Sequence, residues 1–158
     1  MAIFFSPSEI FQFAIKIEEN GEAFYRKMSN KFKDSQTKEL FLYLADEETK
    51  HKQKFKEMLS EIEDYQPPQS YPEEYFLYLK SYAGEHIFSQ EKIAYISSEE
   101  KRTPQQIIEF ALDIERDSIL YYLEAKNLVS PSQKDKLDKI IDEERRHYLK
   151  LLEVKKKW

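Results

Sequence analysis

The stretch FLYLADEETKHKQKF, residues 41–55, has the spacing of an amphipathic helix. Its apolar stripe, which follows steps of three and four residues, contains Phe41, Leu44 and Phe55. Glu48 and His51 continue that stripe, where a helix that packs on a core normally places apolar side chains. The stretch therefore predicts a helix whose buried face includes a carboxylate and an imidazole.

The composition of the 158-residue chain favours a single all-α domain. Hydrophobic residues make up 41% and charged residues 35%, a balance typical of a globular protein rather than a disordered one. There are only two glycines, and the helix-favouring Glu, Lys, Leu and Ile are abundant. The formal net charge of −5 argues against a nucleic-acid partner, and no apolar run approaches the length of a membrane span.

The chain contains no cysteine, which excludes disulfides, thiolate metal sites and thiol catalysis within these residues. Its first residues, MAIFFSPSEIF, have no basic region of the kind that begins a secretory signal. We therefore expect a cytoplasmic protein that does not bind a membrane.

Helix start signals divide the chain into two helical hairpins. A Ser-Pro or Thr-Pro pair followed by Glu or Gln predicts N-caps at Ser6, Thr103 and Ser130. A fourth start lies at Asp34 or Ser35. The expected helices span about 7–32, 35–62, 104–128 and 131–155. Short turns within each pair make its two helices antiparallel.

The two hairpins, about 7–62 and 104–155, enclose a long crossover, about 63–103. Prolines in the crossover end the second helix, and they are Pro67, Pro68 and Pro72. Residues 73–83 are expected to form a short helix there. Two hairpins joined by one long crossover predict a four-helix bundle that occupies residues 1–158 as one domain.

An internal repeat relates the two hairpins. FAIKIEENGEAFY at 13–25 matches FALDIERDSILYY at 110–122. Likewise, ADEETKHKQKF at 45–55 resembles IDEERRHYLKL at 141–151. The two halves therefore look like copies of one helical hairpin, although the chain is too short for a solenoid.

The repeat also places one acid at a similar height on each of the four helices. Glu18 and Glu48 lie almost equally far from the first turn, so their levels differ by only ~3 Å at the rise of an α-helix. Glu115 and Glu144 are matched in the same way about the second turn. All four carboxylates can therefore share one buried layer of the bundle.

Four buried carboxylates cannot stay ionised without compensation, because each unpaired buried charge costs several kcal/mol. A single Glu-x-x-His is usually a solvated pair, but here both copies lie on buried stripes without Lys or Arg. Two divalent cations would neutralise four carboxylates, and oxygen ligands with imidazole suit iron or manganese. The predicted metal ligands are Glu18, Glu48, His51, Glu115, Glu144 and His147.

Several other residues have two open interpretations. Tyr25 and Tyr122 are either core residues or hydrogen-bond partners of ligand carboxylates. Glu22 either faces solvent or adds an acid near the metals. Glu85 and His86, in the crossover, either lie on the surface or cap the site. Acids beside the ligands in sequence should face solvent or a neighbouring helix edge. These acids are Glu19, Glu47 and Glu143.

Four motifs stand on the four main helices, and they are Glu18…Tyr25, EETKH at 47–51, Glu115…Tyr122 and EERRH at 143–147. Together they resemble the rubrerythrin branch of the ferritin-like superfamily. The resemblance implies a ferritin-like bundle with a di-iron centre held by the six ligands named above. Rubrerythrins reduce hydrogen peroxide with electrons delivered through a C-terminal rubredoxin domain.

Two features depart from the rubrerythrin pattern. The four cysteines of a rubredoxin domain are absent, so the chain is similar to short, rubredoxin-free members. Rubrerythrins also have a further Glu on the third helix, one turn after the ligand, where this chain has Ser118. The resemblance therefore implies the plainer six-ligand set, which makes metal binding a firmer expectation than peroxidase activity.

We expect a di-iron oxidoreductase that reduces hydrogen peroxide or dioxygen with electrons from a separate donor protein. Manganese fits the ligands nearly as well as iron. Three alternatives stay open: a ferroxidase or iron-handling protein on the same fold, a purely structural metal, and a metal-free helical module that binds a partner. Eleven Tyr and eleven Phe exceed the needs of one small core and suggest a homodimer.

Overall fold

The computed structural model describes residues 7–62, 73–87 and 89–158. Four long helices form the bundle, and they are α1 (Pro7–Ser29), α2 (Ser35–Ser60), α5 (Pro104–Ala125) and α6 (Pro131–Lys155). The crossover contains α3 (Glu73–Tyr82), the π-helical turn η1 (Ala83–Ile87) and α4 (Gln90–Ser97). A short 3₁₀ turn, η2 (Lys126–Leu128), follows α5.

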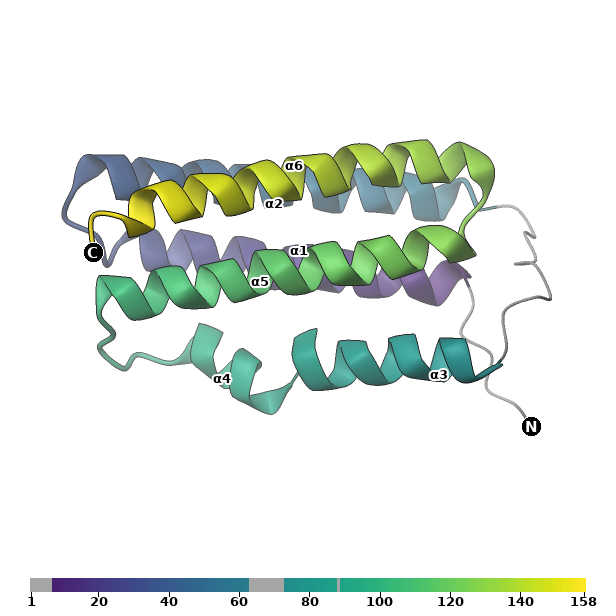
Figure 1. The fold of residues 1–158 in the computed structure, drawn as a ribbon, viewed down its shortest axis with the longest axis horizontal. Helices are drawn as coiled ribbons and strands as arrows, with labels where there is room; N and C mark the ends of the chain where they lie inside the picture. Colours follow the sequence, from purple (N-terminus) through teal and green to yellow (C-terminus); the bar gives the residue numbers. More distant parts are fainter. Residues whose placement is uncertain (1–6, 63–72, 88) are drawn as a thin grey trace.

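The long helices pair as two antiparallel hairpins, α1 with α2 and α5 with α6 (Figure 1). The hairpins dock with α1 against α5 and α2 against α6. The crossover runs along the bundle over α1 and α5, on the side away from α2 and α6 (Figure 1). The predicted all-α bundle of two hairpins with one crossover is confirmed.

Two of the predicted helix caps are present as expected. Asp34 begins α2, and its carboxylate accepts a hydrogen bond from the Thr37 backbone N–H at 3.0 Å. Thr103 and Gln106 form a complete capping box at the start of α5. These bonds satisfy backbone donors that have no partner within the helix.

The capping box predicted at Ser130 is wrong. Ser130 is the N-cap residue of α6, but its side chain makes no capping bond. Gln133, which should complete the box, is buried instead, and its Nε2 donates to the Met58 carbonyl at 3.1 Å. A tertiary contact with the end of α2 therefore replaces the local one. The predicted cap at Ser6 lies outside the described residues.

The crossover contains more helix than expected. The short helix expected over 73–83 is present as α3, and it is followed by η1 and by α4, which were not predicted. The Ser89 hydroxyl caps α4 by accepting from the Lys92 N–H at 3.2 Å. Helices α1, α2 and α5 end two or three residues earlier than predicted, at Ser29, Ser60 and Ala125, whereas α6 ends at residue 155 as predicted.

Two apolar clusters fill the bundle, one toward each end. The first includes Phe11, Phe55 and Ile140, and the second includes Phe24, Phe41 and Ile108. Burying each such side chain contributes about 1.5–3 kcal/mol before the entropic cost of ordering it. On every long helix, one segment belongs to the first cluster and another to the second, and the predicted ligand acid lies between these two segments. The apolar ends therefore hold the four helices around a central polar layer.

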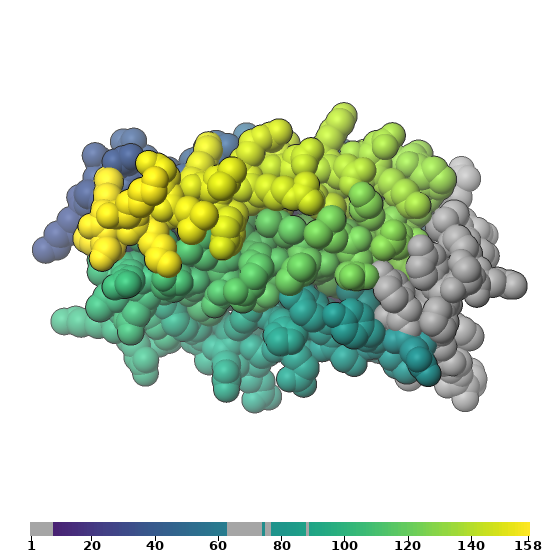
Figure 2. Space-filling view, in the orientation of Figure 1, coloured from purple at the N-terminus to yellow at the C-terminus, as the bar shows by residue number. Residues whose placement is uncertain are grey.

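Side chains close over the interior of the bundle. Figure 2 shows the face formed by α6, α5 and the crossover, whose side chains pack in contact with one another. Each of the six predicted ligands exposes no more than 3% of its surface. Among the described residues, no helix is both long and apolar enough to cross a bilayer.

Candidate metal centre

All six predicted ligands lie in the central polar layer. Each of the four long helices contributes, because the internal repeat gives α1 and α5 one acid each and gives α2 and α6 one Glu-x-x-His each. The acids are Glu18, Glu48, Glu115 and Glu144, and the histidines are His51 and His147. The two imidazole rings lie side by side, with centroids 5.7 Å apart and an angle of 23° between their planes.

The six side chains form two overlapping groups of four. Glu18 and His51 belong to one group, Glu115 and His147 belong to the other, and Glu48 and Glu144 belong to both. Within each group, one ligand atom from every residue lies within 4.8 Å of the others. Two metal ions sharing two carboxylates would take this arrangement, with a terminal Glu and a His at each ion.

Unpartnered polar atoms test whether the residues fit such ions. Glu18 Oε2, His51 Nδ1 and Glu144 Oε1 are buried and have no hydrogen-bond partner. The His51 nitrogen nevertheless lies 3.2 Å from the Glu144 oxygen and 3.5 Å from the Glu18 oxygen. These two carboxylate oxygens and one imidazole nitrogen converge without forming hydrogen bonds. Such a group fits a cation, because buried polar atoms are otherwise almost always paired.

The charge balance of the layer also favours cations. Burial raises the pKa of Glu48 and of Glu115 well above the usual range, and neighbouring carboxylates raise it further. Burial opposes the charge on His51, yet the carboxylates of Glu144 and Glu18 raise its pKa. Burial likewise acts to raise the pKa of Glu144, but the charge on His51 lowers it below the usual range. Positive charge is thus strongly stabilised in this layer.

The two tyrosines hydrogen bond to the carboxylates of two predicted ligands. Tyr25 on α1 donates to Glu115 Oε1 on α5, and Tyr122 on α5 donates to Glu18 Oε1 on α1. Both rings are fully buried. Each hydroxyl holds one oxygen of a terminal carboxylate, so the other oxygen can face a metal ion.

Glu47 and Glu143 face a neighbouring helix, which is one of the two environments expected for the acids beside the predicted ligands. Glu143 Oε2 accepts a hydrogen bond from His51 Nε2 at 2.7 Å. Glu47, whose side chain is only 13% exposed, lies 4.0 Å from His147 Nε2. Each acid thus faces the histidine of the other hairpin. The sequence signal for these contacts is the doubled acid of EExxH, but residue spacing on a single helix does not show which side chain the first acid faces. Glu19 follows the expectation and pairs with Lys16 on the surface.

Gly21 lets Glu48 approach α1 closely. A Cβ atom at position 21 would lie 2.6 Å from Glu48 Oε2, which is closer than a van der Waals contact. Glycine therefore makes room for the shared carboxylate at this point.

The structure does not bring the three additional candidates into the two ligand groups. Glu22 is partly buried, and its carboxylate pairs with Lys52 at 2.9 Å and with Arg26 at 3.3 Å. Glu85 and His86 are exposed on η1. The His86 ring lies 4.7 Å from the Tyr82 ring, which belongs to the crossover.

Four carboxylates and two imidazoles, shared by the helices of an antiparallel bundle, define the class of carboxylate-rich di-metal helical proteins. The Rubrerythrin family model matches residues 9–155, a span that includes all six side chains. The chain belongs to the rubrerythrin family.

A solved structure supports the same assignment. A Thermotoga maritima protein described as a ferritin-like diiron-carboxylate protein is 33% identical to this chain. The similarity covers 96% of this chain and 95% of the other, with a TM-score of 0.73. No curated protein sequence matches the chain.

Proposed function

We propose that the protein is a di-iron oxidoreductase that reduces hydrogen peroxide or dioxygen with electrons from a separate donor protein. The observation that supports this function most strongly is the pair of ligand groups that share Glu48 and Glu144. The family match and the Thermotoga maritima protein favour iron over manganese as the metal. The cytoplasmic location and the homodimer stay predictions.

Two bound iron ions would supply the electrons that cleave an O–O bond. With peroxide as the oxidant, two electrons from the donor and two protons from solvent convert one molecule into two waters. Glu18, Glu115 and the two histidines would be the terminal ligands, and Glu48 and Glu144 would be shared.

The surrounding residues position these ligands and exclude bulk water. Tyr25 and Tyr122 fix the terminal carboxylates, and Glu143 fixes the His51 ring. The two apolar clusters above and below the layer keep solvent away from it. A reduced centre inside such a core would react with small molecules that can enter, and larger oxidants would be excluded.

Metal content tests the binding half of the proposal. Protein loaded anaerobically with Fe(II) should hold two iron ions per chain. Replacing both shared acids, Glu48→Ala with Glu144→Ala, should remove most of that iron because both groups lose two ligands. The matched control replaces the repeat-equivalent surface acids, Asp46→Ala with Asp142→Ala, and should keep two. Iron content near zero in the wild-type protein would contradict the proposal.

Electron accounting tests the catalytic half. A peroxidase or oxidase consumes an added reductant in proportion to oxidant and keeps its iron bound. A ferroxidase instead consumes Fe(II) beyond two per chain and releases Fe(III). The ferroxidase is the second candidate because Ser118 leaves the layer with six ligands rather than the fuller rubrerythrin set. If the protein turns over Fe(II) without consuming the added reductant, it is a ferroxidase and the proposed donor-dependent reduction is wrong.

A further inference from the structure

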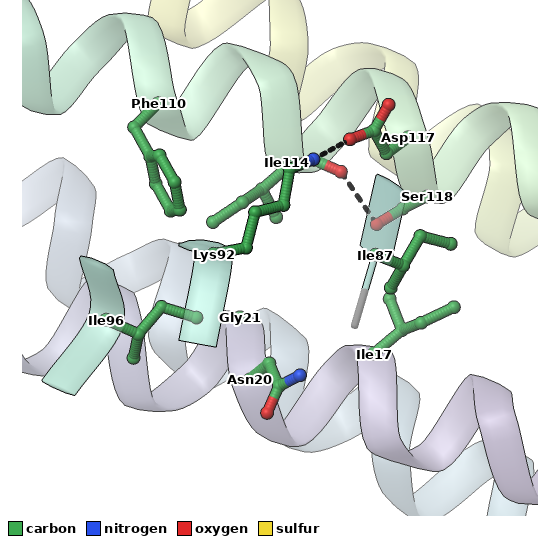
Figure 3. Close-up of a pocket in the computed structure, with 10 residues that line it drawn as sticks. All are labelled: Ile17, Asn20, Gly21, Ile87, Lys92, Ile96, Phe110, Ile114, Asp117 and Ser118. Atoms are coloured by element: carbon green, nitrogen blue, oxygen red, sulfur yellow. Dashed lines mark hydrogen bonds and ion pairs between the residues drawn. The ribbon is translucent and has the colours of Figure 1, made fainter. Parts of the chain in front are cut away.

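A small cavity lies between α1 and α5, beneath the crossover (Figure 3). Its volume is about 20 Å³. That space is enough for one water or a molecule of similar size. Ile87 of η1 and Lys92 and Ile96 of α4 cover it from outside. We call it the crossover cavity.

Repeat-equivalent residues of α1 and α5 line this cavity. The equivalent pairs are Ile17 with Ile114, Asn20 with Asp117, and Gly21 with Ser118. The same equivalence relates Glu18 to Glu115 in the ligand layer. The cavity therefore lies between the same two helices that supply the terminal carboxylates, on the side of the bundle opposite α2 and α6 (Figure 1).

Gly21 connects the cavity with the ligand layer. It lines the cavity, and a Cβ atom at this position would lie 2.6 Å from Glu48 Oε2 of the ligand layer. On the other wall, Ser118 lies one turn after Glu115, and its hydroxyl donates to the Ile114 carbonyl of its own helix at 2.8 Å (Figure 3). Both wall residues are small, so their side chains fill little of the space between α1 and α5.

The walls suit a small neutral molecule. Ile17, Ile87 and Ile114 provide apolar surface. The charged residues at the rim, Lys92 and Asp117, form an ion pair and so offer little net charge to an ion (Figure 3). Asn20 Nδ2 is buried and has no hydrogen-bond partner, so it can donate to an acceptor oxygen.

We propose that the crossover cavity admits a small neutral oxygen species, dioxygen or hydrogen peroxide, and holds it beside Glu48. The histidines lie on α2 and α6, so the oxidant would approach the ligand layer from the opposite side, between α1 and α5. This inference rests on the proposed function, because the molecule held here would be the oxidant of the di-metal centre.

Dioxygen itself is the probe for the first test. Protein loaded with zinc, which has no redox chemistry, is placed under dioxygen pressure, and paramagnetic relaxation of methyl groups is measured by NMR. The methyl groups of Ile17, Ile87 and Ile114 should relax several-fold more than those of Ile140 and Ile141, which are buried but do not line the cavity. Equal relaxation at both sets would overturn the inference.

Variants of Ile87 test the path to the centre. Ile87→Trp, or the smaller Ile87→Phe, should fill the cavity from the crossover, remove the excess relaxation and slow the reaction of reduced protein with peroxide about tenfold. The matched control is Ile93→Trp, since Ile93 is 46% exposed on α4 and does not line the cavity. Unchanged peroxide kinetics in both Ile87 variants, with the zinc content of wild type, would overturn the inference.

These outcomes separate the inference from the function beneath it. If wild-type protein fails to bind two zinc or iron ions, the proposed di-metal function is wrong, and the inference falls with it. If the metals bind and donor-dependent reduction proceeds, but the cavity methyl groups show no excess relaxation, only the inference fails.

Discussion

Gly21 sets the distance between α1 and the shared carboxylate of Glu48. Its backbone lies in an ordinary helix, so glycine is not needed there for conformation. The need is for space, because a methyl group would overlap Glu48 Oε2. Gly84, the other glycine of the chain, has no atom within 4 Å of the corresponding position.

Gly21→Ala should weaken metal binding without unfolding the protein. Alanine favours a helix over glycine by about 0.5–1 kcal/mol, which offsets the cost of moving the end of the Glu48 side chain. The displaced carboxylate can no longer serve both ligand groups. We expect the unfolding free energy of the metal-free variant to stay within about 1 kcal/mol of wild type while iron content falls. Gly84→Ala, measured in parallel by calorimetry and metal analysis, should retain both irons.

Glu143 positions the His51 ring, because its carboxylate accepts a hydrogen bond from His51 Nε2. Carboxylates that orient metal-binding histidines in this way typically contribute about 10–100-fold to metal affinity. Glu143→Ala should therefore lower metal affinity by about 10–100-fold, and Glu143→Gln, which keeps an acceptor oxygen, should recover part of the loss. Competition with a chelator measures this affinity. Glu19→Ala is the surface control. Equal affinity in Glu143→Ala and wild type would show that the His51 ring needs no partner.

Residue spacing along single helices predicted that the six side chains of the polar layer lie together, but it did not predict the positions of Glu47 and Glu143. On a single helix, neighbouring residues point about 100° apart, so an acid next to a predicted ligand turns away from the buried stripe. Each of these two acids instead faces a histidine on a helix of the other hairpin. The relation becomes visible only when α2 and α6 are packed together.

The start of α2 illustrates local stabilisation of a helix. Asp34 accepts from both the backbone N–H and the hydroxyl of Thr37, and Lys157 at the C-terminus lies 3.4 Å away. The bonds to Thr37 and the charge of Lys157 lower the pKa of the Asp34 carboxyl. A lowered pKa means that the cap stabilises the fold above the ordinary pKa of Asp and loses that contribution as pH falls through the folded-state value.

Asp34→Ala should therefore cost about 1 kcal/mol of unfolding free energy at neutral pH, measured by urea denaturation. The difference from wild type should shrink in acid, where the Asp34 carboxyl is protonated. Asp46→Ala, which removes an exposed acid from the same helix, should change stability by less than about 0.5 kcal/mol. A loss at Asp34 that persists unchanged at low pH would contradict the charged-cap explanation.

The long helices with their start signals and the short helix α3 could be predicted from sequence, whereas α4 could not. Helix α4 has only eight residues, too few to show a period, and its identity depends on packing over α1 and α5. Gln133 shows the opposite case. Its spacing from Ser130 predicted a capping box, but its side chain instead donates a tertiary hydrogen bond to the Met58 carbonyl. Periodicity thus gives the bundle, and contacts between the elements decide the rest.

The buried polar layer links the stability of the complete bundle to cations. In the metal-free protein, the raised pKa values of Glu48, Glu115 and His51 mean that the folded state binds protons more tightly than the unfolded state. Such groups stabilise the fold below their unfolded pKa, and the contribution is lost as pH rises toward the folded pKa. Metal ions have the opposite pH dependence, because they require deprotonated ligands.

We therefore expect the unfolding temperature of the metal-free protein to decrease as the pH rises from about 5 to about 8. Adding Fe(II) anaerobically should raise it, and the increase should be larger at the higher pH. Differential scanning calorimetry of wild type and of the Glu48→Ala, Glu144→Ala double variant tests both statements. A metal-induced increase that is larger at pH 5 than at pH 8 would contradict the assignment of protonated carboxylates to this layer.

The position of bound iron is the most direct test of the central claim. Anomalous diffraction from crystals of iron-loaded protein locates the metal without reference to activity. We expect two peaks about 3.5–4 Å apart within the polar layer, one beside His51 and one beside His147, with Glu48 and Glu144 between them. No peaks there, or a single peak outside the layer between Glu47 and Glu143, would contradict it.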